Sequence, residues 1–214
     1  MVLNITKLEV TPFLQNTRII SAANGHEAVV IDPGGETDRI LQALAKEKLK
    51  CTEIWLTHSH LDHCGGVRRL KEVTGAVLYA HPAEAAMRAM VEELAAMYGL
   101  PPGVMENCPE PDKPLTGGEV LEFAGEQFSV LFTPGHSPGH VCFYHQGSDT
   151  LIAGDTLFAG SIGRTDLPGG SHQQLLASIK EKILSLPGQT RVLSGHGPDT
   201  TVEREKTTNP FLTG

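Results

Sequence analysis

The most constraining feature of the sequence is a pattern that recurs along the chain: short apolar segments end at histidine or aspartate. The segment "IWL" runs into the cluster "THSHLDHCGG", and the segments "VLFTPG", "LIAG" and "RVLSG" each run into one such residue. In layered α/β folds the strand ends converge on a crevice, and binding sites are commonly built there. We therefore expect one site at these strand ends. Its residues are His58, His60, Asp62, His63, His136, Asp155 and His196.

The first half of the chain alternates strand and helix patterns. Apolar runs closed by turn residues predict strands in "AVVIDPGG", in "EIWLTHSH" from Ile54 to Thr57, and in "AVLYAH". Between them we predict helices in "ETDRILQALAKEKLK" and "CGGVRRLKEVTG", the second of which stops at Gly75. Strands that alternate with helices indicate an α/β layered fold.

The second half is richer in strands. The segments "EVLEFAG", "QFSVLFTPG", "HVCFYHQ" and "DTLIAGD" have turn signals between them, as in a meander. A helix capped by Ser171 follows, and then the strand "TRVLSGHG". Strands are followed by helices in both halves, and 214 residues suit one α/β domain. We therefore predict a single domain, residues 1–214, built as a pseudo-symmetric sandwich.

Residues 82–118 interrupt this alternation with an Ala- and Met-rich helical stretch and then a Pro-rich irregular one. Two interpretations remain open for this segment. It is either a surface helix with its connection, or a lid that places Met side chains and Tyr98 against a substrate pocket. Long loops of this kind are usually functional or disordered.

Charge and cysteine content restrict the class of partner. The net charge of −8 argues against nucleic acid or an anionic membrane as the main partner, because both attract Lys and Arg. The four cysteines form no C-x-x-C pair, which argues against a zinc ribbon and fits free thiols in a reducing compartment. The start "MVLNITKLEV" lacks the apolar core of a signal peptide, and no apolar run approaches the ~20 residues of a membrane helix. We expect a cytoplasmic protein that acts on a small molecule; its oligomeric state stays open.

The clustered side chains have the chemistry of metal ligands, because imidazole and carboxylate suit zinc and also iron or manganese. His58 and His60 project to the same side of an extended segment and can share one ion. Asp62 and His63 are adjacent at a turn, so their side chains can point to a different position from that of His58 and His60. Seven ligands are too many for one tetrahedral ion and suit two ions that share a bridging carboxylate. The residues therefore predict two divalent ions, with zinc expected first and iron or manganese as alternatives.

The pattern H-x-H-x-D-H, followed by His, Asp and His at wide intervals, resembles the metallo-β-lactamase superfamily over nearly the whole chain. The segments that carry the resemblance are "VIDPGG", "LTHSHLDHCGG", "TPGHSPGHVCFY", "IAGDTLFAGSIGRTDLPGG" and "LSGHGPDTT…NPF". The stretches "TPGHSPGH", "GRTDLPGG" and "NPF" are similar more narrowly to short bacterial glyoxalase II-like hydrolases. The resemblance implies an αββα sandwich with its site along one edge.

The resemblance also implies a role for each ligand. A first metal is held by His58, His60 and His136. A second metal is held by Asp62, His63 and His196, and Asp155 bridges both. A hydroxide between the ions attacks a thioester carbonyl, as in the cleavage of S-D-lactoylglutathione to D-lactate and glutathione. Asp62 is expected to orient that hydroxide, so Asp62 and Asp155 are the expected catalytic residues.

Substrate recognition departs from that family in one respect. Full-length glyoxalase II carries a C-terminal helical domain that supplies basic residues for glutathione, and only a short segment follows His196 here. Arg164 is the best remaining cation near the expected site. It is expected either to bind a substrate carboxylate through its forked donors or to form a structural salt bridge with Asp166.

Other residues near the motifs are expected to support the site or the fold. The superfamily resemblance implies that Asp32 holds a ligand histidine in place from outside the metal shell. His140 is expected either to form a structural hydrogen bond or to support a ligand in the same way. Cys64 is expected to be a buried thiol rather than a ligand. Residues 203–206 have the pattern of a solvated charge run, and residues 209–211 that of a C-terminal staple.

Three other functions remain open. Persulfide dioxygenases share the H-x-H-x-D-H segment and a similar "GRTD" stretch. That resemblance implies a site with one iron ion, held by two histidines and one aspartate, that acts on glutathione persulfide. Lactone or β-lactam hydrolysis uses the same water with another pocket. A metal-binding module without catalysis is the last alternative, although sites with an open coordination position are rarely kept for structure.

Overall fold

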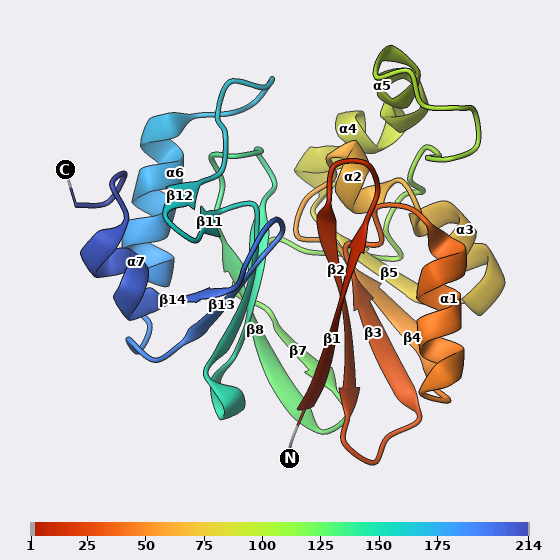
Figure 1. The fold of residues 1–214 in the computed structure, drawn as a ribbon, viewed down its shortest axis with the longest axis horizontal. Helices are drawn as coiled ribbons and strands as arrows, with labels where there is room; N and C mark the ends of the chain where they lie inside the picture. The colour runs from red at the N-terminus through yellow and green to blue at the C-terminus, as the bar shows by residue number, and fades with distance from the viewer. Residues whose placement is uncertain (1–2, 214) are drawn as a thin grey trace. The chain divides into compact units, whose positions relative to one another are not determined.

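The computed structural model describes residues 3–213, which group into two compact units, one ending at Leu115 and the other beginning at Thr116. Each unit contains a six-stranded sheet together with helices (Figure 1). Both units therefore mix α and β structure, which confirms the predicted α/β class. Within the described range, no helix is long and apolar enough to span a bilayer.

The first unit follows the predicted alternation. It contains β1 (Leu3–Val10), β2 (Gln15–Ala22), β3 (Glu27–Ile31), α1 (Thr37–Lys46), β4 (Lys50–Trp55), α2 (Leu61–Cys64), α3 (Val67–Thr74), β5 (Val77–Ala80), the 3-10 turn η1 (Pro82–Glu84), α4 (Ala85–Ala89), α5 (Val91–Met97) and β6 (Lys113–Pro114). The strand order is β1-β2-β3-β4-β5-β6. The first three strands pair antiparallel, and pairing is parallel from β3 onward.

Helices α1 and α3 pack on this sheet because each carries an apolar stripe. Helix α1 buries Ile40 and Leu44, and helix α3 buries Val67 and Leu70. These side chains join one core cluster with aliphatic residues of β3, β4 and β5. Burying an aliphatic side chain contributes about 1.5–3 kcal/mol, so the stripes fix both helices on the sheet. Helix α3 ends at Gly75 in the left-handed conformation, as predicted.

Strand β4 ends at Trp55, before the predicted end at Thr57. The backbone N–H of Thr57 donates to Oδ1 of Asp32 at 2.8 Å instead of to a neighbouring strand. Asp32 follows β3 and has a φ of 51°, a left-handed conformation that costs energy in a residue other than glycine. The strand therefore stops where a side chain takes over its hydrogen bond, and the histidine cluster starts directly afterwards.

The hairpin of β1 and β2 is absent from the prediction. Strand β2 reads "QNTRIISA", and all eight of its residues are buried although five of them are polar. Oγ1 of Thr17 donates to the carbonyl oxygen of Asp32 at 2.8 Å and also lies 3.1 Å from Oε1 of Gln15. The partner at Asp32 lies outside the strand and its neighbouring turn. A strand whose buried side chains are polar therefore shows no apolar pattern from which it could be predicted.

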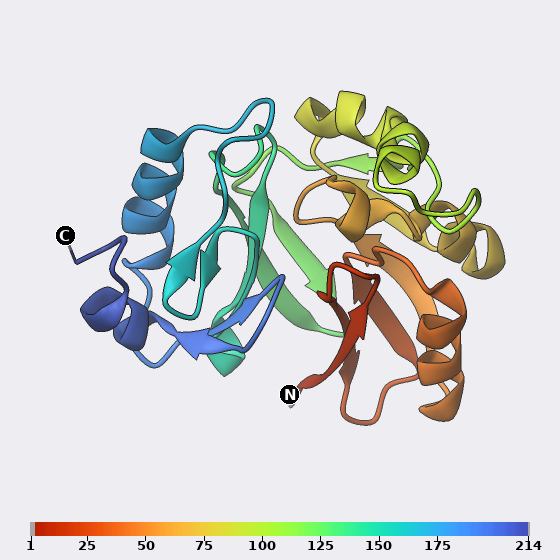
Figure 2. The same ribbon diagram turned by 45° about the horizontal axis from the view of Figure 1, so that its top comes forward.

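Residues 82–115 of the segment 82–118 lie in the first unit, and residues 116–118 begin the second. The helical part of the segment breaks at Met90 into α4 and α5, and both helices contact α2 (Figure 2). Its Pro-rich part ends in β6, which pairs parallel with β5. The segment therefore packs on the loop that carries the histidine cluster, and whether it also acts as a lid stays a prediction.

The second unit contains the predicted meander. Its elements are β7 (Val120–Phe123), β8 (Glu126–Phe132), β9 (Val141–His145), the 3-10 turn η2 (Gln146–Ser148), β10 (Thr150–Gly154), β11 (Leu157–Phe158), β12 (Ser161–Ile162), α6 (His172–Ser178), the π-helical turn η3 (Ile179–Ile183), β13 (Arg191–Ser194), β14 (Thr200–Thr201) and α7 (Val202–Thr208). The strand order is β14-β13-β10-β9-β8-β7, with β13 parallel to β10. Ser171 caps α6 as predicted, because its Oγ accepts the N–H of Gln174.

The C-terminal segment differs from the prediction at one residue. The run 203–206 was expected to be solvated, but it lies in α7 and its Glu205 is fully buried. The Glu205 carboxylate accepts the N–H of Gly160 at 2.8 Å, the hydroxyl of Thr200 at 2.5 Å and Nδ2 of Asn209 at 2.8 Å. A buried carboxylate needs such donors. Asn209 therefore fastens the C-terminal segment, as predicted, and Glu205 shares that role.

Replacement of Glu205 by alanine is expected to lower the free energy of unfolding by about 2–3 kcal/mol, because buried donors lose their acceptor. Urea unfolding followed by circular dichroism measures the change. Glu203→Ala is the matched control in the same helix turn, where the side chain is exposed and the expected loss is within about 0.5 kcal/mol. Equal losses in the two variants would remove the structural role from Glu205.

Candidate metal centre

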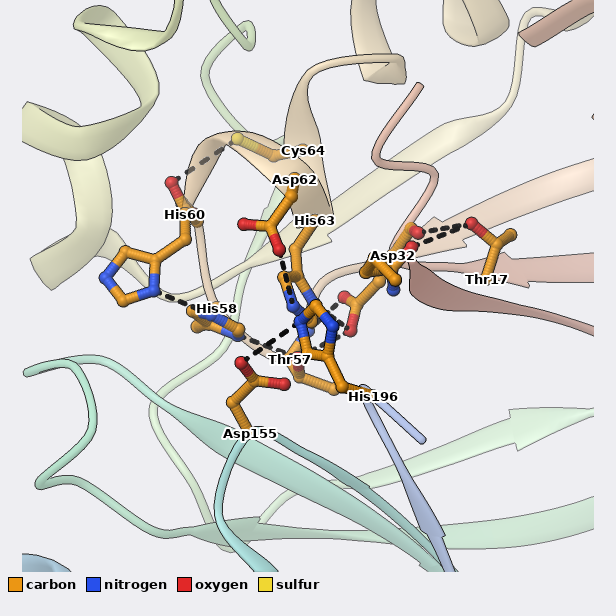
Figure 3. Close-up of polar contacts among 12 residues, drawn as sticks. Thr17, Asp32, Thr57, His58, His60, Asp62, His63, Cys64, Asp155 and His196 are labelled. Carbon is orange, nitrogen blue, oxygen red and sulfur yellow. Dashed lines mark hydrogen bonds and ion pairs between the residues drawn. The ribbon is translucent and has the colours of Figure 1, made fainter. Parts of the chain in front are cut away.

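The first unit carries its candidate ligands on the loop after β4 and on helix α2 (Figure 3). His58 and His60 lie in the loop, with Nε2 of His58 3.1 Å from Nδ1 of His60. Asp62 and His63 lie in α2, and Oδ2 of Asp62 is 3.8 Å from Nε2 of His63. The cluster is therefore folded into two pairs of neighbouring ligand atoms.

Asp32 holds the ring of His63 and the start of this loop (Figure 3). Its Oδ2 lies 3.0 Å from Nδ1 of His63 and accepts the hydroxyl of Thr57 at 2.6 Å. Because a carboxylate accepts, Nδ1 of His63 carries the proton and Nε2 keeps its lone pair for a metal. Asp32, His58 and His63 also offer ligand atoms that all lie within 4.8 Å of one another.

The close approach of α2 to the turn after β3 depends on Gly34. A Cβ added at Gly34 would lie 1.5 Å from the carbonyl oxygen of Asp62. No side chain is accommodated at that distance, so glycine is required there. The turn "DPGG" therefore sets the position of α2 and of the ligands on it.

The second unit places three candidate ligands after β8, β10 and β13, at one edge of its sheet. Oδ2 of Asp155 is 3.6 Å from Nε2 of His136 and 3.5 Å from Nε2 of His196, and Figure 3 shows the second of these contacts. Nδ1 of His136 donates to the carbonyl oxygen of Arg164 at 2.8 Å. In the neutral ring that bond leaves Nε2 of His136 as the metal-binding nitrogen.

The spacings within each unit fit metal ligands better than hydrogen bonds. Separations of 3.5–3.8 Å between the carboxylate oxygens and the imidazole nitrogens exceed the usual length of an N–H···O bond. Two donors bound at ~2.1 Å by a tetrahedral ion lie about 3.4 Å apart. The imidazole and carboxylate donors of each unit therefore suit a divalent ion such as zinc or iron.

His140 is buried and positions the backbone of Asp155. Its Nε2 accepts the N–H of Asp155 at 3.1 Å, so the proton of the neutral ring is on Nδ1, which lies 2.9 Å from Oγ1 of Thr133. His140 therefore fixes the residue that the sequence predicts as the bridge.

Arg164 and Asp166 form the salt bridge that the sequence predicts as one alternative. Nε and Nη2 of Arg164 donate to the two carboxylate oxygens of Asp166, both at 2.7 Å. These hydrogen bonds lower the pKa of Asp166 to about 2. Both side chains are more than half exposed, so solvent screens the pair.

Tyr98, the other predicted substrate residue, lies directly after α5 and is exposed. Its ring packs edge to face on Phe13, with the centroids 5.3 Å apart. Its contact with a substrate stays a prediction.

Cys64 is a buried thiol, as predicted. Its Sγ donates to the carbonyl oxygen of Ser59 at 3.4 Å. Burial raises the pKa of the Cys64 thiol, and the neighbouring Cys108 raises it further. The thiol therefore has a hydrogen-bond partner in the backbone at Ser59, as expected of a buried thiol of the fold.

Sequence reasoning missed Glu84 beside this loop. Glu84 is fully buried, and its Oε2 accepts the N–H of Ser59 at 3.0 Å. The available signal was the pair Glu84 and Arg88, one helical turn apart within a stretch of alanine and methionine. Such a pair usually indicates a solvated helix face, but here both residues are fully buried.

The sequence as a whole decides the family. Residues 10–196 match the metallo-β-lactamase superfamily. The chain belongs to this superfamily. The resemblance inferred from the ligand motifs is thereby confirmed.

Relatives of similar length include hydrolases. The chain is 41% identical over 188 residues to a probable metallo-hydrolase, YqgX, from Bacillus subtilis, with 88% of each chain covered. It is 37% identical over 212 residues to the hydroxyacylglutathione hydrolase GloC from Haemophilus influenzae, with 98% of each chain covered.

Solved structures with the same fold cover nearly the whole chain. The B3 metallo-β-lactamase BLEG-1 has a TM-score of 0.90 at 39% identity, covering 99% of this chain and 100% of that chain. TTHA1623 in a di-iron-bound form has a TM-score of 0.87 at 40% identity, covering 97% and 100%. ETHE1 from Myxococcus xanthus has a TM-score of 0.79 at 27% identity, covering 97% and 83%. The predicted metallo-β-lactamase fold is confirmed.

Replacement of Asp32 by alanine is expected to weaken zinc binding about 10–100-fold, because the tautomer and orientation of His63 are no longer fixed. Competition with a chromophoric chelator measures the dissociation constant. Asp38→Ala removes an exposed carboxylate from α1 and is expected to leave the constant unchanged. If both variants bind zinc as tightly as the unmodified chain, Asp32 does not support the ligands.

Proposed function

We propose that this chain is a dinuclear metal-dependent hydrolase that cleaves a thioester. The observation that carries the proposal is the Asp155 carboxylate, which lies 3.6 and 3.5 Å from Nε2 of His136 and His196. One carboxylate placed between two imidazoles in this way suits a bridge between two ions. Membership of a hydrolase-rich superfamily supports the same reading.

The ligands divide between two ions in this proposal. The first ion takes His58, His60 and His136. The second takes Asp62, His63 and His196, and Asp155 contacts both. Zinc suits these donors, and iron is supported as an alternative by the di-iron form of TTHA1623.

Each residue near the ions has a distinct task. When bound, two divalent ions lower the pKa of a water molecule and polarise the substrate carbonyl. Asp155 would hold both ions, and His140 holds the backbone of Asp155. Asp62 accepts a hydrogen bond from the attacking water and orients it. Asp32 keeps His63 in the tautomer that binds metal.

A glutathione thioester such as S-D-lactoylglutathione is the proposed substrate. The support is the hydroxyacylglutathione hydrolase GloC, to which the chain is similar over almost its whole length. Arg164 is proposed to bind a substrate carboxylate. Its present partner Asp166 is exposed, so exchange of one carboxylate for another has a small free-energy cost. The four buried free thiols support a cytoplasmic location.

Two specific likenesses favour other reactions. The stretch "GRTD" at residues 163–166, which resembles that of persulfide dioxygenases, favours the one-iron dioxygenase acting on glutathione persulfide. The likeness to the B3 metallo-β-lactamase BLEG-1 favours hydrolysis of a β-lactam. Both are alternatives on the same ligand set.

A panel of three assays on the purified metal-loaded protein tests the proposal. The substrates are S-D-lactoylglutathione, glutathione persulfide with an oxygen electrode, and a chromogenic cephalosporin. The thioester is expected to give the highest kcat/KM, measured as released thiol. Oxygen uptake on the persulfide without thioester cleavage would refute the hydrolase.

A further inference from the structure

Glu84 lies outside the candidate ligand set, but its side chain reaches the backbone between two of the ligands. It ends the turn η1 and is fully buried. Its Oε2 accepts the backbone N–H of Ser59 at 3.0 Å. Ser59 stands between His58 and His60, so this hydrogen bond fixes the peptide that joins the two histidines.

The backbone at Ser59 controls the distance between the neighbouring imidazoles. His58 and His60 are separated by Ser59 alone, and the backbone of His60 is extended, with φ −64° and ψ 153°. Nε2 of His58 and Nδ1 of His60 are 3.1 Å apart, close to the separation of two donors on one ion. A rotation of the Ser59 peptide would change that separation directly.

The turn that carries Glu84 is fastened by Arg88. Arg88, one helical turn further on, is fully buried and donates to the carbonyl oxygen of His81 at 3.0 Å. Its other terminal nitrogen donates to Glu110 at 2.8 Å, and its carbonyl oxygen accepts the N–H of Cys108 at 2.9 Å. The turn that presents Glu84 is therefore tied, through Arg88, to His81 and to residues 108 and 110.

We propose that Glu84 is a positioning residue for the first metal, acting through the N–H of Ser59 to set the spacing of His58 and His60. The assignment rests on the metal site of the proposed function. It gives segment 82–118 a definite role, because Glu84 of this segment accepts a hydrogen bond from the loop that carries His58 and His60. Removal of a fully buried carboxylate that accepts from a backbone amide is expected to destabilise the local structure, because the amide N–H is left without an acceptor.

The test compares three replacements of Glu84 by their Co²⁺ binding. Glu84→Gln keeps an oxygen that accepts the Ser59 N–H, Glu84→Asp withdraws the carboxylate by one methylene, and Glu84→Ala removes it. Glu92→Ala is the matched control. Glu92 lies in the same segment and accepts the N–H of Asn107, far along the chain from the ligand loop.

The readouts are the Co²⁺ dissociation constant and the visible d–d spectrum, and circular dichroism reports whether each variant is folded. Glu84→Asp and Glu84→Ala are expected to bind Co²⁺ about 10–100-fold more weakly, with a shifted spectrum. Glu84→Gln and Glu92→Ala are expected to match the unmodified chain. If Glu84→Ala does not fold, the comparison of the Asp and Gln variants decides.

Unchanged Co²⁺ affinity and spectrum in the folded Asp variant would overturn the proposal. Equal weakening in the Asp and Gln variants would also overturn it, because the loss would not depend on the acceptor. These readouts use the metal alone. They stay decisive even where the unmodified chain fails to cleave a thioester, so failure of the proposed function is recognised separately.

Discussion

Replacement of Asp155 by alanine is expected to lower thioester kcat/KM by more than about 100-fold, the upper range for losing a partner outside the metal shell. The bound metal is expected to fall from two ions per chain to one or none. The reason is geometric, because one carboxylate oxygen lies 3.6 Å from Nε2 of His136 and 3.5 Å from Nε2 of His196. Loss of that oxygen removes a ligand from both proposed ions and leaves them without a bridge.

Metal content by inductively coupled plasma mass spectrometry and the rate of thiol release measure this change. Glu122→Gln is the control, because it neutralises an exposed carboxylate on β7 of the same unit. It is expected to keep both metals and the full rate. Two ions per chain with normal turnover in Asp155→Ala would contradict the bridging assignment.

Replacement of His63 by alanine is the second change that is expected to have a large effect on metal content and activity. It is expected to leave one ion per chain and to lower thioester kcat/KM by more than about 100-fold, again above the range for a supporting residue. His63 is fully buried, with Nδ1 held by Asp32, so its Nε2 has a single orientation to offer. No exposed residue can substitute for a ligand fixed in this way.

This variant also separates the two-metal and one-iron accounts. A site of two histidines and one aspartate does not need all of the predicted ligands. If the unmodified chain holds one iron and His63→Ala keeps both that iron and its activity, the second ion does not exist. His26→Ala provides the control, because it removes an exposed histidine that lies before β3. It is expected to change neither metal content nor rate.

The sequence predicts those parts of the fold whose signals are local. The helix that ends at Gly75, the cap at Ser171 and the meander of β7 to β10 depend on spacing and turn residues within short windows. The hairpin strand β2 has no such signal, because its buried polar residues find partners such as the carbonyl oxygen of Asp32. Glu205 was misplaced for the same reason, since its donors at Gly160 and Thr200 come from other elements.

The candidate site follows the same division. The candidate ligands of each unit could be named from the sequence because they follow apolar strands, and the strand ends of one sheet share an edge. The protonation of the ligand rings could not, because it depends on contacts such as Nδ1 of His136 with the carbonyl oxygen of Arg164. Glu84 could not be predicted either, since its partner Ser59 lies in a different element.

Titration of the metal-free protein with zinc, followed by the rate of S-D-lactoylglutathione cleavage at each addition, tests the dinuclear thioesterase. The rate is expected to rise until two ions are bound per chain and to stay constant beyond that point. A rate that reaches its maximum at one ion per chain, or no cleavage at any zinc concentration, would contradict this expectation.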